Sequence, residues 1–176
     1  MEKRTFLFPS LYLFCSAWLA TGAYVDGWAH NHIPELETFF TPWHAILYSG
    51  YLASVIVLLV WIFFRRTNGL RGSRIIPEGL GFSLAGMLIF FFGGLGDMLW
   101  HIVFGIEAGI EALLSPTHLL LATGVFLMAG GGAKHWQHLY TIHPKRWTHF
   151  PLALSVTFTL MVITYMTQFA RYTQII

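Results

Sequence analysis

Five long apolar stretches, joined by short polar connections, constrain this chain more than any other feature of its sequence. They run over about residues 6–28, 41–64, 79–104, 115–131 and 150–170. A helix needs about 20 apolar residues to cross the hydrocarbon core of a bilayer, and the five stretches use most of the chain. The sequence therefore predicts an all-α integral membrane protein of about five transmembrane helices, folded as a single domain over residues 1–176.

The composition agrees with this prediction and narrows the function classes. Hydrophobic residues make up 56% of the chain and charged residues only 10%, whereas soluble domains carry roughly a quarter charged residues. The net charge of +2 gives no indication of a nucleic-acid partner, so the expected surroundings are a lipid bilayer. The single cysteine, Cys15, lies in the first apolar stretch, which excludes a disulfide framework and a site built from several thiolates.

The basic residues predict how the chain is oriented in the membrane. Nine of the ten Lys and Arg residues lie before the first stretch, between the second and third, or between the fourth and fifth, and Arg171 is the exception. Lysine and arginine accumulate in cytoplasmic loops. We therefore expect a cytoplasmic N terminus, an extracytoplasmic C terminus, and first and third helices that end on the extracytoplasmic side.

Two predicted helical hairpins, over about residues 10–64 and 79–131, carry the same polar residues in the same order, and the helix at 150–170 stands outside this repeat. Both hairpins run outward and then back, so the repeat is parallel. The second copy is three residues longer between its first His and its Glu. The matching residues are Asp26, His30, Glu37, Thr41, Pro42, His44 and Gly50 in the first hairpin, and Asp97, His101, Glu111, Ser115, Pro116, His118 and Gly124 in the second.

The spacing of these residues favours a metal site in each hairpin. An Asp and a His four residues apart lie on one helix face. A hydroxyl residue followed by Pro is typical of a helix start, so the second His falls in the first helical turn, where the helix dipole disfavours imidazolium. Neutral imidazole is the form that binds metal. The predicted ligands are Asp26, His30 and His44 in one hairpin and Asp97, His101 and His118 in the other, with Glu37 and Glu111 as further ligands from the outer connections.

Two alternatives stay open at this point. Asp–His pairs in membranes also act as hydrogen-bonded struts or proton relays, although ionisable residues there mark function and the full set occurs twice. The ligands could form one dinuclear centre or two mononuclear sites, and Gly93, Gly94 and Gly96 would let the helices approach closely beside Asp97. Mixed nitrogen and oxygen ligands suit Cu(II), Zn, Fe or Mn better than Cu(I).

Two segments of the repeat resemble a known family. Asp26-Gly-Trp-Ala-His30 with Phe40-Thr41-Pro42-Trp43-His44 resembles the C subunit of the particulate methane and ammonia monooxygenases, and Asp97-x3-His101 with Ser115-Pro116-Thr117-His118 is similar to a second element of that subunit. The resemblance covers about residues 20–125. It implies copper as the expected cofactor, with iron or zinc as alternatives. One copper site would comprise Asp26, His30 and His44, and the other Asp97, His101 and His118.

The resemblance also implies a function and a setting. We expect a copper-dependent, monooxygenase-like oxidoreductase, or a subunit of one, that acts on a small apolar substrate in a bacterial or archaeal plasma membrane. Its expected partners are further copies of the chain or other membrane subunits. The alternatives are a non-enzymatic metal-handling protein and a structural or assembly subunit of a larger membrane complex.

Overall fold

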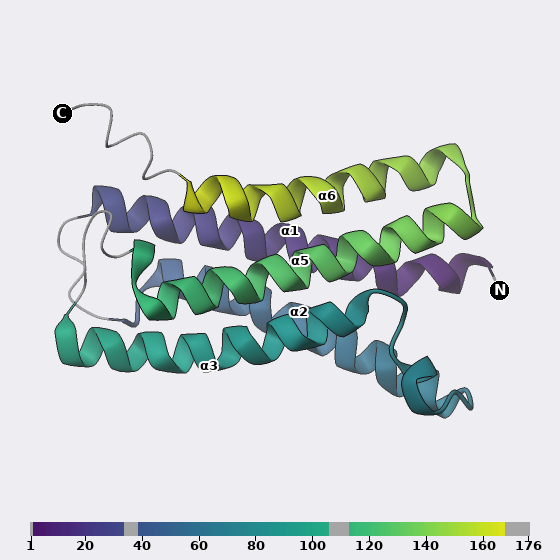
Figure 1. Ribbon diagram of the computed structural model, residues 1–176, viewed down its shortest axis with the longest axis horizontal. Helices are drawn as coiled ribbons and strands as arrows, with labels where there is room; N and C mark the ends of the chain where they lie inside the picture. Colours follow the sequence, from purple (N-terminus) through teal and green to yellow (C-terminus); the bar gives the residue numbers. More distant parts are fainter. Residues whose placement is uncertain (1, 34–38, 106–112, 168–176) are drawn as a thin grey trace.

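The computed structural model describes residues 2–33, 39–105 and 113–167. Within these ranges the chain forms five long α-helices and one short 3-10 helix, without a strand. The α-helices lie side by side along the long axis of the molecule (Figure 1), and all five are long and apolar enough to cross a membrane. This confirms the predicted all-α architecture. The elements are α1 (Glu2–His32), α2 (Pro42–Thr67), η1 (Gly72–Ile75), α3 (Leu80–Phe104), α5 (Pro116–Ile142) and α6 (Arg146–Met166).

The helices form two antiparallel hairpins and one additional helix. Helix α1 packs against α2, α3 packs against α5, and α6 lies along α5 and α1. Helices α1 and α3 both end, and α2 and α5 both begin, at one end of the bundle, on the left in Figure 1. We call it the tip end. The two hairpins therefore run in parallel, as the repeat predicts, and α6 also ends at the tip end.

Glycines at equivalent positions bring the two helices of each hairpin into contact. A Cβ atom added to Gly50 of α2 would lie 2.8 Å from the backbone nitrogen of Leu19 on α1, and one added to Gly124 of α5 would lie 2.7 Å from Cβ of Phe90 on α3. Leu19 and Phe90 each precede the Asp of their hairpin by seven residues. The returning helix is therefore held at the same level in both copies.

A second pair of glycines repeats this contact nearer the tip end. A Cβ at Gly22 of α1 would lie 2.7 Å from Cα of Leu47, and one at Gly93 of α3 would lie 3.2 Å from the backbone nitrogen of Leu121. Each glycine precedes its Asp by four residues, and each leucine follows the second His of its hairpin by three. The duplication seen in the sequence is thus also a duplication of helix contacts.

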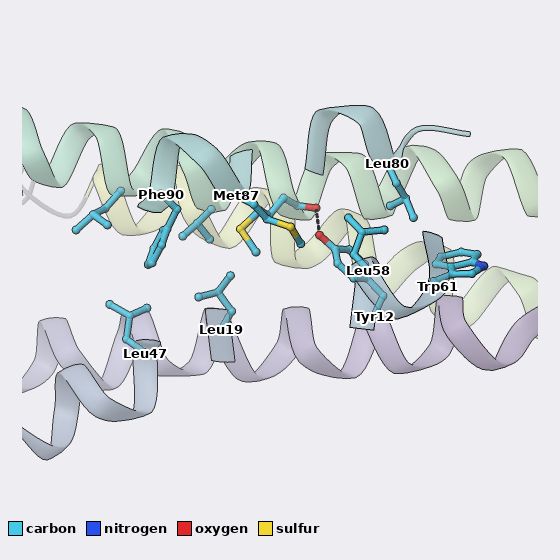
Figure 2. Close-up of a cluster of buried hydrophobic side chains, with 11 residues drawn as sticks. Tyr12, Leu19, Leu47, Leu58, Trp61, Leu80, Met87 and Phe90 are labelled. Atoms are coloured by element: carbon cyan, nitrogen blue, oxygen red, sulfur yellow. Dashed lines mark hydrogen bonds between the residues drawn. The ribbon is translucent and has the colours of Figure 1, made fainter. Parts of the chain in front are cut away.

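A cluster of buried apolar side chains lies in the interior of the bundle (Figure 2), and hydrogen bonds pair polar groups beside it. The Tyr12 hydroxyl of α1 donates a hydrogen bond of 3.2 Å to the carbonyl oxygen of Met128 on α5. The Ser83 hydroxyl of α3 donates to the same carbonyl over 2.9 Å. Because no water is available at this depth to pair with a hydroxyl, these bonds satisfy both groups. The Tyr12 bond links the two hairpins, and the Ser83 bond links α3 to α5 within the second hairpin.

The predicted end of the fourth helix is wrong. The sequence predicted an end near residue 131, within the run of Gly130, Gly131 and Gly132, but α5 continues to Ile142. The glycines serve packing instead, because a Cβ at Gly131 would lie 2.7 Å from the backbone nitrogen of Ser83 on α3. Helix α6 accordingly begins at Arg146 rather than near 150, and the predicted end near 170 lies outside the described residues.

The close contact at Gly124 gives a test of the fold. Gly124→Ala would force a Cβ into Phe90 and the carbonyl of Gly86, and overpacking of this kind costs roughly 1–3 kcal/mol. We expect a lower melting temperature in detergent, measured by circular dichroism. Gly81→Ala is the matched control, because nothing lies within 4 Å of a Cβ there. Equal melting temperatures for the two variants would contradict the packing described.

Candidate metal centre

The first group of predicted ligands lies at the tip end between α1 and α2. Nε2 of His44 is 3.5 Å from Oδ1 of Asp26, and Nδ1 of His30 is 3.8 Å from Oδ2. One donor atom from each residue lies within 4.8 Å of the others. Asp26 is only 7% exposed and His44 only 4%. We call these three residues the first triad.

The second triad, Asp97, His101 and His118, repeats this arrangement between α3 and α5. Nε2 of His118 is 3.4 Å from Oδ1 of Asp97, and Nε2 of His101 is 3.7 Å from Oδ2. Asp97 is 1% exposed. The structure thus brings together all six aspartates and histidines that the sequence predicted as ligands.

The local sequence explains why the returning histidines point into the site. Helices α2 and α5 begin at Pro42 and Pro116, where the sequence predicts their starts. The Thr41 hydroxyl accepts a hydrogen bond of 3.1 Å from the backbone nitrogen of His44. Ser115 accepts the equivalent bond from His118 over 3.3 Å. Such caps fix the first helical turn, and with it the position of each histidine.

The spacing of the donor atoms fits a shared metal ion better than direct hydrogen bonds. Hydrogen bonds from nitrogen to oxygen are about 2.7–3.2 Å long, whereas Nε2 of His44, His101 and His118 lies 3.4–3.7 Å from the nearest carboxylate oxygen. Two ligand atoms that each lie about 2.1 Å from a tetrahedral ion are roughly 3.4 Å apart. Each triad therefore surrounds a position at which one ion could contact several donors.

Hydrogen bonds outside the cluster orient three of the four imidazoles in the way that metal-binding histidines require. Nδ1 of His30 donates to the carbonyl of Asp26 over 2.9 Å, and Nδ1 of His44 donates to the carbonyl of Phe39 over 2.6 Å. Nδ1 of His101 donates to the carbonyl of Gly105 over 3.2 Å. A proton held at Nδ1 leaves a lone pair on Nε2 for a metal, and metal ligands are commonly fixed by such bonds.

Several donor atoms in the cluster are buried and have no hydrogen-bond partner. They are Oδ1 of Asp26, Nε2 of His30 and Nε2 of His101. Unpaired polar groups are costly away from water, and three in one place need an explanation. A cation bound in each triad would satisfy all three atoms, so the residues present fit metal ions.

The two triads form one cluster across the hairpins. The ring centre of His30 lies 6.3 Å from that of His101 and 6.4 Å from that of His118. The ring centre of His44 lies 6.2 Å from that of His101. The two triads are therefore adjacent, with four imidazoles and two carboxylates in one place. Both a dinuclear centre and two neighbouring mononuclear sites are compatible with this arrangement.

The surroundings of the two carboxylates differ. The Thr117 hydroxyl donates a hydrogen bond of 3.0 Å to Oδ1 of Asp97. Ser115 Oγ lies 3.2 Å from the Thr117 hydroxyl and 2.8 Å from Nδ1 of His118, which joins these groups into one chain. In the first hairpin Trp43 stands at the position of Thr117. The contact of Thr117 with Asp97 was not predicted, although a hydroxyl residue directly before a ligand histidine is a signal for it.

The remaining predicted ligands are not tested by this arrangement. Glu37 and Glu111 lie outside the described residues. His32, near the end of α1, is exposed, and its Nδ1 donates to the carbonyl of Trp28 over 2.9 Å. It belongs to neither triad.

The chain was also compared with known proteins. No protein-family model, curated protein or solved structure matches it. The similarity of the two motifs to the monooxygenase C subunit thus stays a prediction, and the site is described from its own geometry.

The hydrogen bond from Thr117 gives a test of the second triad. Thr117→Val keeps the shape of the side chain but removes the donor to Asp97. Because loss of a partner that orients a ligand typically weakens metal binding 10–100-fold, we expect a drop of that size at one of the two metal positions, measured by metal titration. Thr123→Val is the control, since that exposed hydroxyl bonds only to the carbonyl of Leu119 in its own helix. A Thr117→Val variant that binds metal like the wild type would rule out this role.

Proposed function

We propose that this protein is a membrane metalloprotein that binds a transition metal in the cluster formed by the two triads. One observation carries the proposal. Both hairpins direct an Asp and two His side chains into the same buried space, and three donor atoms there lack a hydrogen-bond partner. A pair of hydrogen-bonded struts would leave fewer donors unpaired.

Copper is the metal that we propose first, with iron or zinc as alternatives. Imidazole and carboxylate donors suit Cu(II), and the two motifs resemble those of a copper-binding subunit. Bound copper would supply one-electron redox chemistry, including reaction with dioxygen. The residues of this chain would hold the metal, fix the imidazole orientations and exclude bulk water.

On this basis we propose a copper-dependent, monooxygenase-like oxidoreductase, or a subunit of one, with a small apolar substrate. Around the cluster, the outer face of α3 is apolar, and Leu99, Ile102 and Val103 are 58–69% exposed. An apolar molecule dissolved in the bilayer could reach the tip end along this face. Further copies of the chain or other membrane subunits are the proposed partners.

A structural or assembly role is the second candidate. Each triad draws its ligands from both helices of one hairpin, so a bound ion would hold those two helices together. Transport has less support, because the described residues contain no third group of candidate ligands that could pass an ion along the bundle.

The cluster is proposed to face the extracytoplasmic side. The basic residues that follow α2, Arg71 and Arg74 among them, lie at the opposite end of the bundle from the tip end, and such residues favour the cytoplasm. The protein would belong to a bacterial or archaeal plasma membrane.

Elemental analysis of purified protein tests metal binding. We expect the wild type to retain copper. His44→Ala should lose metal from the first triad, His118→Ala from the second, and the double variant from both, because each change removes one of three nearby donors. His32→Ala is the matched control and should keep the wild-type content. Wild-type protein without any redox-active metal after growth with copper would refute the oxidoreductase proposal.

The same set of variants separates the two candidate functions. An oxidoreductase should lose activity in the double variant while the protein still assembles in the membrane. If the double variant keeps its activity but no longer assembles, the structural role is correct.

Cysteine labelling tests the orientation. In a Cys15→Ser background, Asn68→Cys places a thiol at the end opposite the cluster, and Thr167→Cys places one at the tip end. A membrane-impermeant maleimide should label Thr167→Cys in intact cells, and Asn68→Cys only after the membrane is opened. The reverse labelling pattern would invert the proposed topology.

A further inference from the structure

Tyr48 reaches from the first hairpin to the second beside the metal centre. It lies on α2 one turn after His44, with ring centres 6.2 Å apart. Its ring also contacts Phe90 of α3, with ring centres 5.7 Å apart. A Cβ added to Gly94 of α3 would lie 3.0 Å from the phenol oxygen. Gly94 is three residues before Asp97, so the hydroxyl lies about one helical turn from the second triad.

The absence of a side chain at Gly94 is what gives the phenol this position. A Cβ there would also lie 2.9 Å from Cε1 of the Tyr48 ring, closer than the two atoms could remain. The run of glycines before Asp97 thus has a second use beside helix packing, since one of its members makes room for a side chain of the other hairpin.

The Tyr48 hydroxyl is buried and has no hydrogen-bond partner among the residues that the structure describes. Three other tyrosines of the described chain have hydrogen-bonded hydroxyls. The hydroxyls of Tyr12, Tyr24 and Tyr51 donate to the backbone carbonyls of helices packed beside them. Buried hydroxyls are normally paired, so an unpaired phenol next to a cluster of unpaired metal donors indicates a partner that belongs to the site.

The chemistry of the cluster defines that partner. The carboxylates accept hydrogen bonds, and the Nε2 atoms fixed by Nδ1 bonds have lone pairs that suit a cation. The phenol is a donor, and it lies within electrostatic range of both Asp97 and Asp26. A cation bound in the triads would occupy the lone pairs of the carboxylates and of the Nε2 atoms. The phenol proton would then be free to form a hydrogen bond with a small ligand that comes from outside the protein.

We propose that the Tyr48 hydroxyl donates a hydrogen bond to a small exogenous ligand held at the metal centre between the two hairpins. This ligand is a small anion or a molecule that binds the metal through an oxygen atom. This inference rests on the proposed metal binding. It makes Tyr48 a residue that touches the bound ligand without being a ligand of the metal.

Azide is a suitable probe, because it binds Cu(II) and accepts hydrogen bonds. The experiment titrates azide into copper-loaded wild type, Tyr48→Phe and Tyr51→Phe, and follows the azide-to-copper charge-transfer band. A hydrogen bond to a charged acceptor corresponds to about a tenfold change in affinity or more. We expect Tyr48→Phe to bind azide about tenfold more weakly with unchanged copper content. Tyr51→Phe should match the wild type, because Tyr51 lies one turn further along α2 and its hydroxyl bonds to Met87.

A second variant and the copper content make the outcomes distinct. Gly94→Ala would displace the Tyr48 side chain without changing residue 48 itself. This variant should therefore also bind azide more weakly than the wild type. Unchanged azide affinity in Tyr48→Phe overturns the inference, and so does loss of copper from Tyr48→Phe, which would make the phenol a metal ligand. If the wild type binds no copper at all, the proposed function itself fails, and that result is separate from any difference between the tyrosine variants.

Discussion

Two carboxylates buried among four imidazoles are the interaction on which the rest of this structure depends. A carboxylate in an apolar interior is stable only when other groups compensate its charge. Asp97 is almost fully buried and accepts a hydrogen bond from Thr117, and Oδ1 of Asp26 has no hydrogen-bond partner among the described residues. The imidazoles beside them are too distant for short hydrogen bonds. A cation, as we propose, would compensate this charge, and in each triad it would join the outgoing helix to the returning one.

The helix contacts explain how the chain forms such a cluster. In each hairpin an Asp and a His come from the outgoing helix, and the second His comes from the returning one. Gly50 against Leu19, and Gly124 against Phe90, set the relative height of the two helices. A larger residue at either glycine would separate them and shift the second histidine relative to the aspartate. The packing glycines thus help to position the ligands, although they lie further from the tip end than the triads do.

Features that depend on local sequence and on the repeat were predicted correctly, including the three residues that meet in each triad. Features that depend on packing away from the repeated motif were not. Five apolar stretches fix the helices, and Thr41-Pro42 and Ser115-Pro116 fix the starts of α2 and α5, because a cap acts within one turn. The end of α5 was missed because Gly131 packs against α3 rather than ending the helix. The repeat left open whether the two triads meet, because that depends on contacts between hairpins. The position of Tyr48 over Gly94 also joins residues of different hairpins, and no local pattern in the sequence predicts it.

The duplication gives the two triads the same scaffold but different surroundings. Thr117 gives Asp97 a hydrogen-bond donor, whereas Trp43 at the equivalent position has no hydroxyl to offer Asp26. The chain through Ser115 also contacts His118, while His44 is fixed by the carbonyl of Phe39. A hydrogen bond to a ligand carboxylate fixes its orientation toward a metal, so Asp97 is oriented by Thr117 while Oδ1 of Asp26 has no such partner among the described residues. Two ions bound in the proposed site would therefore differ in how firmly their carboxylate ligand is held, even though the helices that hold them are nearly the same.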